Sequence, residues 1–179
     1  MFRHKSELRI PGPVPVPPQV LQAHGKPMIN HRGRDFKALF PKVLQDLQPW
    51  FGTTEQIYAV TGSGTAGMET AMVNVISPGD PILALVGGAF GQRWQAMGRA
   101  FGADVITLEY PWGEGVQPGQ VREILKDRPD IKGIFATQNE SSTGVLNDIQ
   151  GLAEAKAGTD ALLVVDAVSS LGGTEMEMD

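Results

Sequence analysis

The sequence predicts an α/β domain with a mostly parallel sheet and flanking helices. Segments with the character of strands and helices alternate from residue 57 to residue 166, as in chains built from strand–helix–strand units. Two uninterrupted apolar runs, residues 82–86 and 161–165, have the composition of strands buried on both faces. The length of 179 residues allows one well-buried domain and is too short for two large ones.

A proline-rich arm and one long helix precede the alternating elements. Residues 10–20 contain five prolines, which favour an extended, polyproline-like arm and exclude a helix or a central strand. Such an arm is either a flexible tail or a segment that lies along another surface. Residues 35–50 place apolar side chains at helical spacing, with Pro49 as the expected stop. Strands are predicted at residues 57–60, 82–86, 105–110, 131–137 and 161–166, and helices at residues 65–76, 90–101, 117–127 and 148–157.

Composition excludes several classes of protein. The net charge of −5 gives no general attraction to nucleic acid or to an anionic membrane. The absence of cysteine excludes disulfides, thiolate catalysis and cysteine-based zinc sites. All three histidines lie near the N-terminus without metal-binding spacing, so no metal site is expected. With no leader-like segment and no apolar run of membrane-spanning length, a soluble, cytoplasmic protein is expected.

Ligands of open α/β sheets bind at the carboxyl ends of the strands, so the segments after the strands are the candidate sites. Residues 61–67 join a strand to a helix, and the free amides at such a helix start favour an anion such as phosphate. The same segment contains Gly62-x-Gly64-x-x-Gly67, but the next strand ends without the carboxylate that a dinucleotide site needs. A phosphate turn is therefore favoured over a dinucleotide site and over a merely tight turn.

Three further features follow strands. Asp166 ends an apolar strand, where a carboxylate needs donors or a cation: it is either a structural cap or ion pair, or it holds a ligand cation such as a pyridinium. Phe90 lies at a glycine-rich strand–helix junction, and its spacing alone narrowly favours a core position over stacking on a flat ring. Residues 139–144 offer hydroxyls and amides, either as a simple turn or as ligand contacts. A serine hydrolase is poorly supported, because no Gly-x-Ser-x-Gly occurs.

Taken together, these segments resemble the class V aminotransferases of the alanine–glyoxylate and serine–glyoxylate (serine–pyruvate) group. The resemblance covers almost the whole chain in the same order. It includes the arm of residues 11–40, Gly-Ser-Gly-Thr-Ala-Gly-Met-Glu within residues 61–80, Gly-Ala-Phe-Gly-Gln-Arg at 88–93, and the segments 139–146 and 165–173. It implies the front part of the large domain of a fold type I enzyme that uses pyridoxal 5′-phosphate (PLP). It also implies an arm at residues 1–34, a partial PLP-binding domain at 35–179, and a homodimer.

The resemblance implies a role for individual residues. Gly64, Thr65 and Ala66 would hold the PLP phosphate. Phe90 would stack on the ring and Val168 would pack on its other face. The remaining implied residues are Ser141 near the ring hydroxyl, Asp166 as the catalytic partner of the pyridinium nitrogen, and Gly12 in the arm near the substrate carboxylate. These roles favour a functional interpretation of Phe90 and of the arm.

Four positions depart from the family pattern, and one feature is missing. Thr65, Phe90, Gln138 and Asn30 stand where the family often has His, Trp, His and Gly, changes expected to alter substrate or affinity more than chemistry. The family's Schiff-base lysine lies beyond the aspartate, in a Gly-Ser-Gln-Lys context, whereas every lysine of this chain precedes Asp166. We therefore expect a truncated, non-catalytic form of such an enzyme, whether engineered, proteolytic or natural.

The predicted function of the full-length protein is transamination of alanine or serine, with glyoxylate or pyruvate as acceptor. Its partners would be amino-acid and 2-oxo-acid substrates. Two alternatives stay open: an inactive cofactor-binding or interaction module on the same half-domain, and another class V PLP enzyme such as a phosphoserine aminotransferase or a cysteine desulfurase-like protein. A nucleotide-dependent oxidoreductase, with NAD bound at residues 62–67, is the weakest alternative.

Overall fold

The computed structural model describes residues 8–179, which form two compact units. One unit holds the chain up to Ala59 together with Glu175–Asp179, and the other is Val60–Thr174. The second unit contains the sheet and all but one of the predicted site residues. The predicted division of the chain into an arm and a domain after residue 34 stays a prediction.

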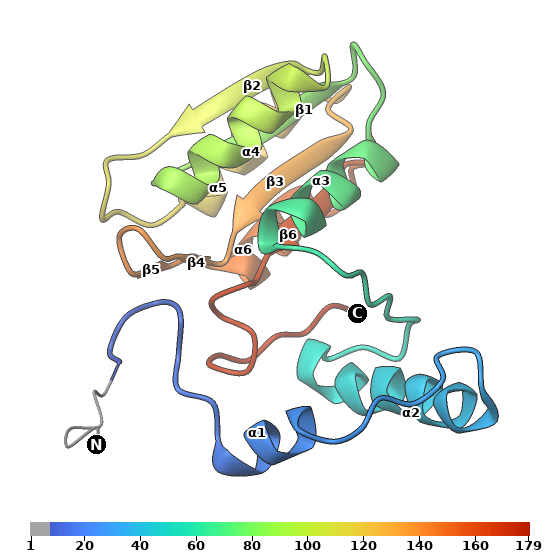
Figure 1. Cartoon of the computed structure of the whole chain (residues 1–179). Helices are drawn as coiled ribbons and strands as arrows, with labels where there is room; N and C mark the ends of the chain where they lie inside the picture. Colours follow the sequence, from blue (N-terminus) through green and yellow to red (C-terminus); the bar gives the residue numbers. More distant parts are fainter. Residues whose placement is uncertain (1–7) are drawn as a thin grey trace. The chain divides into compact units, whose positions relative to one another are not determined.

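The second unit is built on a four-stranded sheet with strand order β2-β1-β3-β6, and every neighbouring pair is parallel (Figure 1). Its strands are β1 (Pro81–Val86), β2 (Asp104–Glu109), β3 (Gly133–Thr137) and β6 (Leu162–Asp166). Each strand is followed by a turn at the same edge of the sheet, because parallel strands all end on one side. The predicted α/β fold with a mostly parallel sheet is confirmed.

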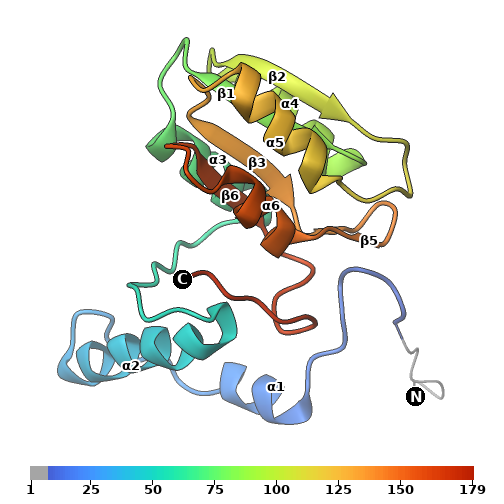
Figure 2. The ribbon, with the colours of Figure 1, turned by 180° about the vertical axis from the view of Figure 1, so that it is seen from behind.

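Helices cover both faces of this sheet. Figure 1 shows α3 (Gly64–Val75) and α4 (Ala89–Ala100) on the near face, and Figure 2 shows α5 (Pro118–Asp127) and α6 (Ile149–Lys156) on the other. Successive side chains of a strand point to opposite faces. Phe135 of β3 therefore packs with Trp94 of α4, and its neighbour Ile134 packs in the cluster that contains Val121 of α5 and Leu152 of α6.

The apolar runs behave differently in the middle and at the edge of the sheet. The last five residues of β1 and all of β3 are buried, as expected for strands with neighbours on both sides. β6 pairs only with β3 among the described strands, and Leu162 is 51% exposed. The prediction of burial on both faces is right for residues 82–86. For residues 161–165 it is right at Ala161, wrong at Leu162 and only partly right at 163–165, because composition does not show which strand lies at an edge.

One predicted strand is absent, and one hairpin in the structure was not predicted. Residues 57–60 form no strand, and Tyr58 and Val60 are 76% and 64% exposed. An apolar run becomes a strand only where a neighbour supplies hydrogen bonds, and no described strand pairs with these residues. A short antiparallel hairpin of β4 (Asn139–Glu140) and β5 (Val145–Leu146), which was not predicted, follows β3.

The first unit contains α1 (Pro18–His24) and α2 (Arg34–Phe51). Helix was excluded from residues 10–20, which was wrong for residues 18–20. Pro18 occupies the first helical position, where proline is tolerated. The predicted stop at Pro49 was also wrong. α2 continues past Pro49 to Gly52, which ends the helix in the left-handed conformation with φ of 58°. Within residues 8–179, no helix is both long and apolar enough to cross a membrane.

Candidate functional site

The candidate site lies at the carboxyl ends of β1, β3 and β6, where α3 begins. A cavity of about 210 Å³ opens here between α3 and the end of β6. Its lining brings together Gly64 at the start of α3, Asp166 at the end of β6, and Val168 just beyond it. The contact between the two walls is close, because a Cβ added at Gly64 would lie 3.0 Å from Cγ2 of Val168. Three of the predicted site residues, from segments far apart in the sequence, thus share one cavity.

The first turn of α3 is capped and still keeps free amides. Ser63 is the N-cap residue, and its hydroxyl accepts a hydrogen bond of 3.3 Å from the amide of Ala66. The amides of Gly64 and Thr65 make no hydrogen bond within residues 8–179. Free amides at a helix start attract an anion. Gly64 and Thr65 are therefore placed to bind an anion through their backbone, whereas the amide of Ala66 is already engaged by Ser63.

The start of α4 lies at the same edge of the sheet, the rim formed by the carboxyl ends of β1, β3 and β6. Its first amides already have hydrogen-bond partners. The amides of Phe90 and Gly91 donate to the carboxylate of Glu140, with shortest distances of 3.1 and 3.0 Å. The amide of Ala89 donates to the hydroxyl of Ser142 at 3.0 Å. Because the hairpin after β3 caps α4, α3 is the one of these two described helix starts that keeps free amides for an anion. The structure thereby distinguishes two helix starts that look alike in sequence.

Thr65 and Phe90 lie on either side of one arginine. Arg93 donates from Nη1 to Oγ1 of Thr65 at 2.9 Å, and its guanidinium carbon lies 4.8 Å from the centre of the Phe90 ring. Arg93 forms no salt bridge with a carboxylate in the described part of the chain. No role for Arg93 was predicted from the sequence, although an arginine after a glycine-rich turn is a signal of an anion site.

Asp166 is a buried carboxylate without a cationic partner. It is 8% exposed, and its Oδ1 accepts a hydrogen bond of 2.9 Å from the amide of Val168. Across residues 8–179 it forms no salt bridge. Its register neighbour on β3 is Thr137, which is 5% exposed and whose hydroxyl finds no partner among the described residues. A carboxylate so placed favours a cation brought by a ligand.

Ser141 belongs to a small hydroxyl cluster at the start of the hairpin turn. Its hydroxyl donates to that of Ser169 at 2.5 Å, and the side-chain amide of Asn139 donates to the same oxygen at 2.9 Å. Ser169 in turn donates to the backbone carbonyl of Asn139 at 3.1 Å. The predicted segments 139–144 and 166–173 therefore meet in this cluster. Ser169, which sequence reasoning did not single out, connects them.

Two predicted features lie elsewhere. Gly12 is exposed and belongs to the first unit, so its approach to a substrate stays a prediction. Residues 8–179 contain no group of three or more His, Asp or Glu side chains arranged to hold a metal ion. What the rim assembles is an anion-binding turn facing a buried carboxylate, with an aromatic ring and hydroxyl groups at the same edge. These features suit an organic ligand that carries charges of both signs.

A parallel sheet with this arrangement places the chain among the fold type I aminotransferases, which its structural neighbours represent. The chain belongs to the class-V aminotransferase family, whose model matches residues 17–179. The crystal structure of an alanine–glyoxylate aminotransferase from Nostoc sp. superposes with a TM-score of 0.88 and 35% identity, over 93% of this chain and 44% of that one.

Curated relatives belong to the glyoxylate group that the sequence motifs resemble. An L-aspartate–glyoxylate aminotransferase of Paracoccus denitrificans is 40% identical over 175 residues, which cover 95% of this chain and 44% of that protein. A serine–glyoxylate aminotransferase of Methylorubrum extorquens is 35% identical over 180 residues, covering 98% of this chain and 45% of that protein. The predicted family is confirmed, and the chain spans less than half the length of these relatives.

Proposed function

We propose that this chain forms the cofactor-binding part of a PLP-dependent aminotransferase that acts on alanine or serine, with glyoxylate or pyruvate as acceptor. The observation that carries the proposal is the position of Asp166. Its buried carboxylate forms no salt bridge within residues 8–179, and it lines a cavity together with Gly64, which begins the turn of α3 where the amides of Gly64 and Thr65 are free. PLP carries a cationic ring nitrogen and an anionic phosphate, which complement these two walls.

Different residues of the rim would hold different parts of such a ligand. Gly64 and Thr65 would bind the phosphate with their amides, and Ala66 would join them if its amide leaves Ser63. Asp166 would hold the proton on the ring nitrogen, because a carboxylate within a few ångströms favours the charged form of a cation. When bound, PLP withdraws electrons from the substrate's α-carbon.

The other predicted contacts complete the proposed site. Phe90 would stack on the ring and Val168, which is 74% exposed, would cover its other face. Ser141 would reach the ring hydroxyl from the cluster that it forms with Ser169. Gly12 would approach the substrate carboxylate. A homodimer, and amino-acid and 2-oxo-acid substrates, are parts of the same proposal for the whole protein.

The names of the relatives support glyoxylate as acceptor more than any single donor. The aminotransferases compared above act with glyoxylate, while their donors are aspartate, serine and alanine. The donor is therefore the less constrained half of the proposal. Two alternatives are tested alongside it. A transamination assay of the full-length protein with each donor distinguishes a phosphoserine aminotransferase or a desulfurase-like activity, and also an inactive cofactor-binding module.

Titration of the chain with PLP, followed by calorimetry, tests the proposal. Wild type should bind PLP, and Asp166→Asn should bind it about 10- to 100-fold more weakly, because a hydrogen bond to a charged group contributes about 1.5–3 kcal/mol. Asp160→Asn, an exposed aspartate before β6, is the matched control and should bind as wild type. Tight binding of NAD without binding of PLP, or equal PLP affinity of Asp166→Asn and wild type, would contradict the proposal.

A further inference from the structure

We infer that Glu140 is a positioning residue of this site, whose buried carboxylate holds the Phe90 turn and the Ser141 hairpin together. The inference rests on the proposed function, because it concerns the residues that would contact the ring. Glu140 ends β4, directly before Ser141, and is 2% exposed. No role follows for it from the motifs of the sequence, where it is one polar residue in a turn-like cluster.

The carboxylate of Glu140 makes hydrogen bonds to two different segments. Its Oε2 accepts from the amides of Phe90 at 3.1 Å and of Gly91 at 3.0 Å, which begin α4. Its Oε1 accepts from the hydroxyl of Ser142 at 2.6 Å and from the amide of Ser142 at 3.2 Å. One side chain thus connects the turn after β1, which carries Phe90, with the hairpin after β3, which carries Ser141.

The groups that bond to Glu140 are all donors, which suits the two acceptor oxygens of a carboxylate. All of the hydrogen bonds above run toward its oxygens, and no salt bridge to it occurs among residues 8–179. The positive end of the α4 dipole and the amide donors stabilise the negative charge instead of a cation. A glutamine here would turn an NH₂ group toward amide or hydroxyl donors, because its side-chain nitrogen cannot accept.

Gly88 shows independently how closely these segments approach. A Cβ added at Gly88 would lie 2.5 Å from Cγ and Cδ of Glu140 and 2.6 Å from the hydroxyl of Ser142. The backbone of Gly88 is extended, with φ of 173°, so the conformation does not require glycine. The glycine is required because the Glu140 side chain packs against the turn where a side chain would be. The position of the Phe90 ring relative to Ser141 therefore depends on this contact.

The test compares Glu140→Gln with Asp148→Asn in the same chain. Asp148 is the N-cap of α6, and its carboxylate accepts from the amide of Gly151 at 2.8 Å, so the control also removes a carboxylate cap from a helix. Both variants lose a negative charge at a helix start, but the asparagine oxygen can still accept from the Gly151 amide, so Asp148→Asn should lose little stability in urea. Glu140→Gln should lose more, and its hydrogen exchange should speed up at Phe90 and Gly91, whereas exchange at Gly151 should change little in Asp148→Asn.

Of these two variants, Glu140→Gln should change cofactor binding and Asp148→Asn should not. We expect its affinity for PLP to fall about tenfold, since two charge-assisted hydrogen bonds that orient the Phe90 turn are lost. The circular dichroism of bound PLP should also change, because the asymmetry around the ring is altered. Ser142→Ala removes the hydroxyl that bonds both Glu140 and Ala89, and should give a smaller change in the same direction. If Glu140→Gln does not fold, Ser142→Ala tests the same positioning role.

Each remaining outcome decides between the two proposals. If wild type does not bind PLP, the proposed function fails and the role of Glu140 in this site fails with it. If wild type binds PLP, and Glu140→Gln and Ser142→Ala bind with the same affinity and the same circular dichroism, the proposed function stands and the positioning role is overturned. Glu140 would then be a structural cap of α4 and nothing more.

Discussion

Arg93 donates a hydrogen bond of 2.9 Å to the hydroxyl of Thr65 and so connects α4 to the first turn of α3. A guanidinium can only donate, so the Thr65 oxygen must accept in this pair. The hydroxyl proton of Thr65 is therefore available for another acceptor, such as a phosphate oxygen. The same guanidinium lies over the Phe90 ring.

From this pair we predict that Arg93→Met weakens PLP binding about three- to tenfold, because a hydrogen bond and a nearby positive charge are lost. Calorimetry at low and at high salt measures the effect, which should be smaller at high salt. Arg99→Met removes an exposed arginine from the other end of α4 and is the control. An Arg93→Met affinity equal to wild type at low salt would contradict the role of this pair.

The buried hydroxyl of Thr137 predicts a substitution that stabilises the chain. It has no hydrogen-bond partner in the described residues, and a buried unsatisfied hydroxyl costs about 1–3 kcal/mol. Valine has nearly the same shape as threonine but no hydroxyl, so Thr137→Val should raise the free energy of unfolding in urea by about 1 kcal/mol. Thr107→Val should act in the opposite direction, because the Thr107 hydroxyl accepts a hydrogen bond of 2.8 Å from Gln95. A destabilised Thr137→Val would show that the hydroxyl has a partner.

Substitution by alanine should lower the free energy of unfolding by different amounts at two glycines of α4, Gly91 and Gly98. A Cβ at Gly91 would lie 2.6 Å from the carbonyl oxygen of Leu85 and 2.8 Å from Cα of Val86, which are backbone atoms of β1. At Gly98 the nearest atom, at 2.7 Å, is Cδ1 of Ile82, the movable end of a side chain. We expect Gly91→Ala to lower the free energy of unfolding by about 3 kcal/mol.

Gly98→Ala is the matched comparison for that substitution. It should cost less than about 1 kcal/mol, because the gain in helix propensity offsets part of the strain. Urea unfolding of both variants measures the difference. Equal costs at the two positions would show that α4 can move away from β1.

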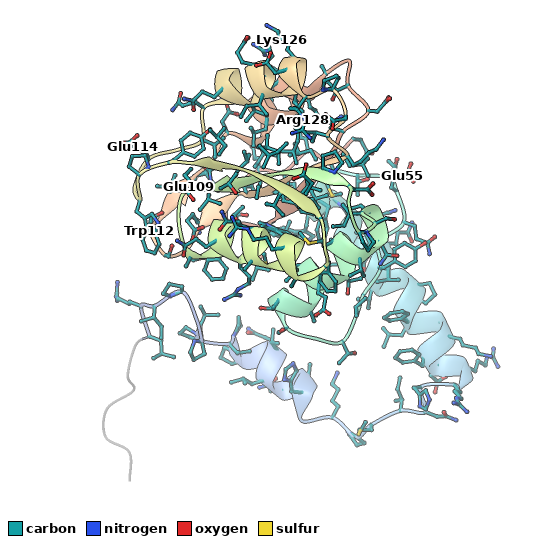
Figure 3. All side chains as sticks on the ribbon, turned by 90° about the horizontal axis from the view of Figure 1, so that it is seen from above. Glu55, Glu109, Trp112, Glu114, Lys126 and Arg128 are labelled. Atoms are coloured by element: carbon teal, nitrogen blue, oxygen red, sulfur yellow. The ribbon has the colours of Figure 1, made fainter. Side chains whose placement is uncertain are left out.

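The exposed pair of Arg128 and Asp130 predicts a change in the pKa of Asp130 when the arginine is replaced. Arg128, labelled in Figure 3, donates from Nε to Asp130 at 2.9 Å and from Nη2 to Asp104 at 3.4 Å. The hydrogen bond from Arg128 is the main cause that lowers the pKa of the Asp130 carboxyl below its ordinary value. A lowered folded pKa stabilises the fold at pH values above the unfolded pKa. This contribution is lost as the pH falls through the folded value.

We therefore expect Arg128→Met to raise the pKa of Asp130 toward the ordinary aspartate range, which NMR titration of the carboxyl carbon measures. The variant should also lose less stability than wild type as the pH falls from neutrality to about 3, since the linkage at Asp130 is weakened. The absolute effect on stability is small, because the pair is solvent-exposed. An Asp130 pKa that stays low in Arg128→Met would assign the shift to another cause.

The sequence was sufficient for the elements whose signals are local. The alternation of apolar runs with helical patterns predicted the four strands of the sheet and the helices between them to within about two residues, as is usual for strongly periodic segments. Glycine- and hydroxyl-rich segments, and one aspartate at the end of an apolar run, identified the parts of the chain that carry Gly64, Ser141 and Asp166. Their order along the chain was also sufficient to recognise the family.

Tertiary structure decided what depends on neighbours far along the chain. Residues 57–60 are apolar but pair with no described strand, and Leu162 is exposed because β6 has only β3 as a neighbour among the described strands. Both helix starts follow glycine-rich turns in the sequence, which does not show whether their amides are free. Only the folded chain shows that Glu140 and Ser142 occupy the amides of α4, whereas those of Gly64 and Thr65 stay free. Local patterns specify elements, but a hydrogen bond between residues some fifty positions apart exists only after the sheet has brought the ends of its strands together.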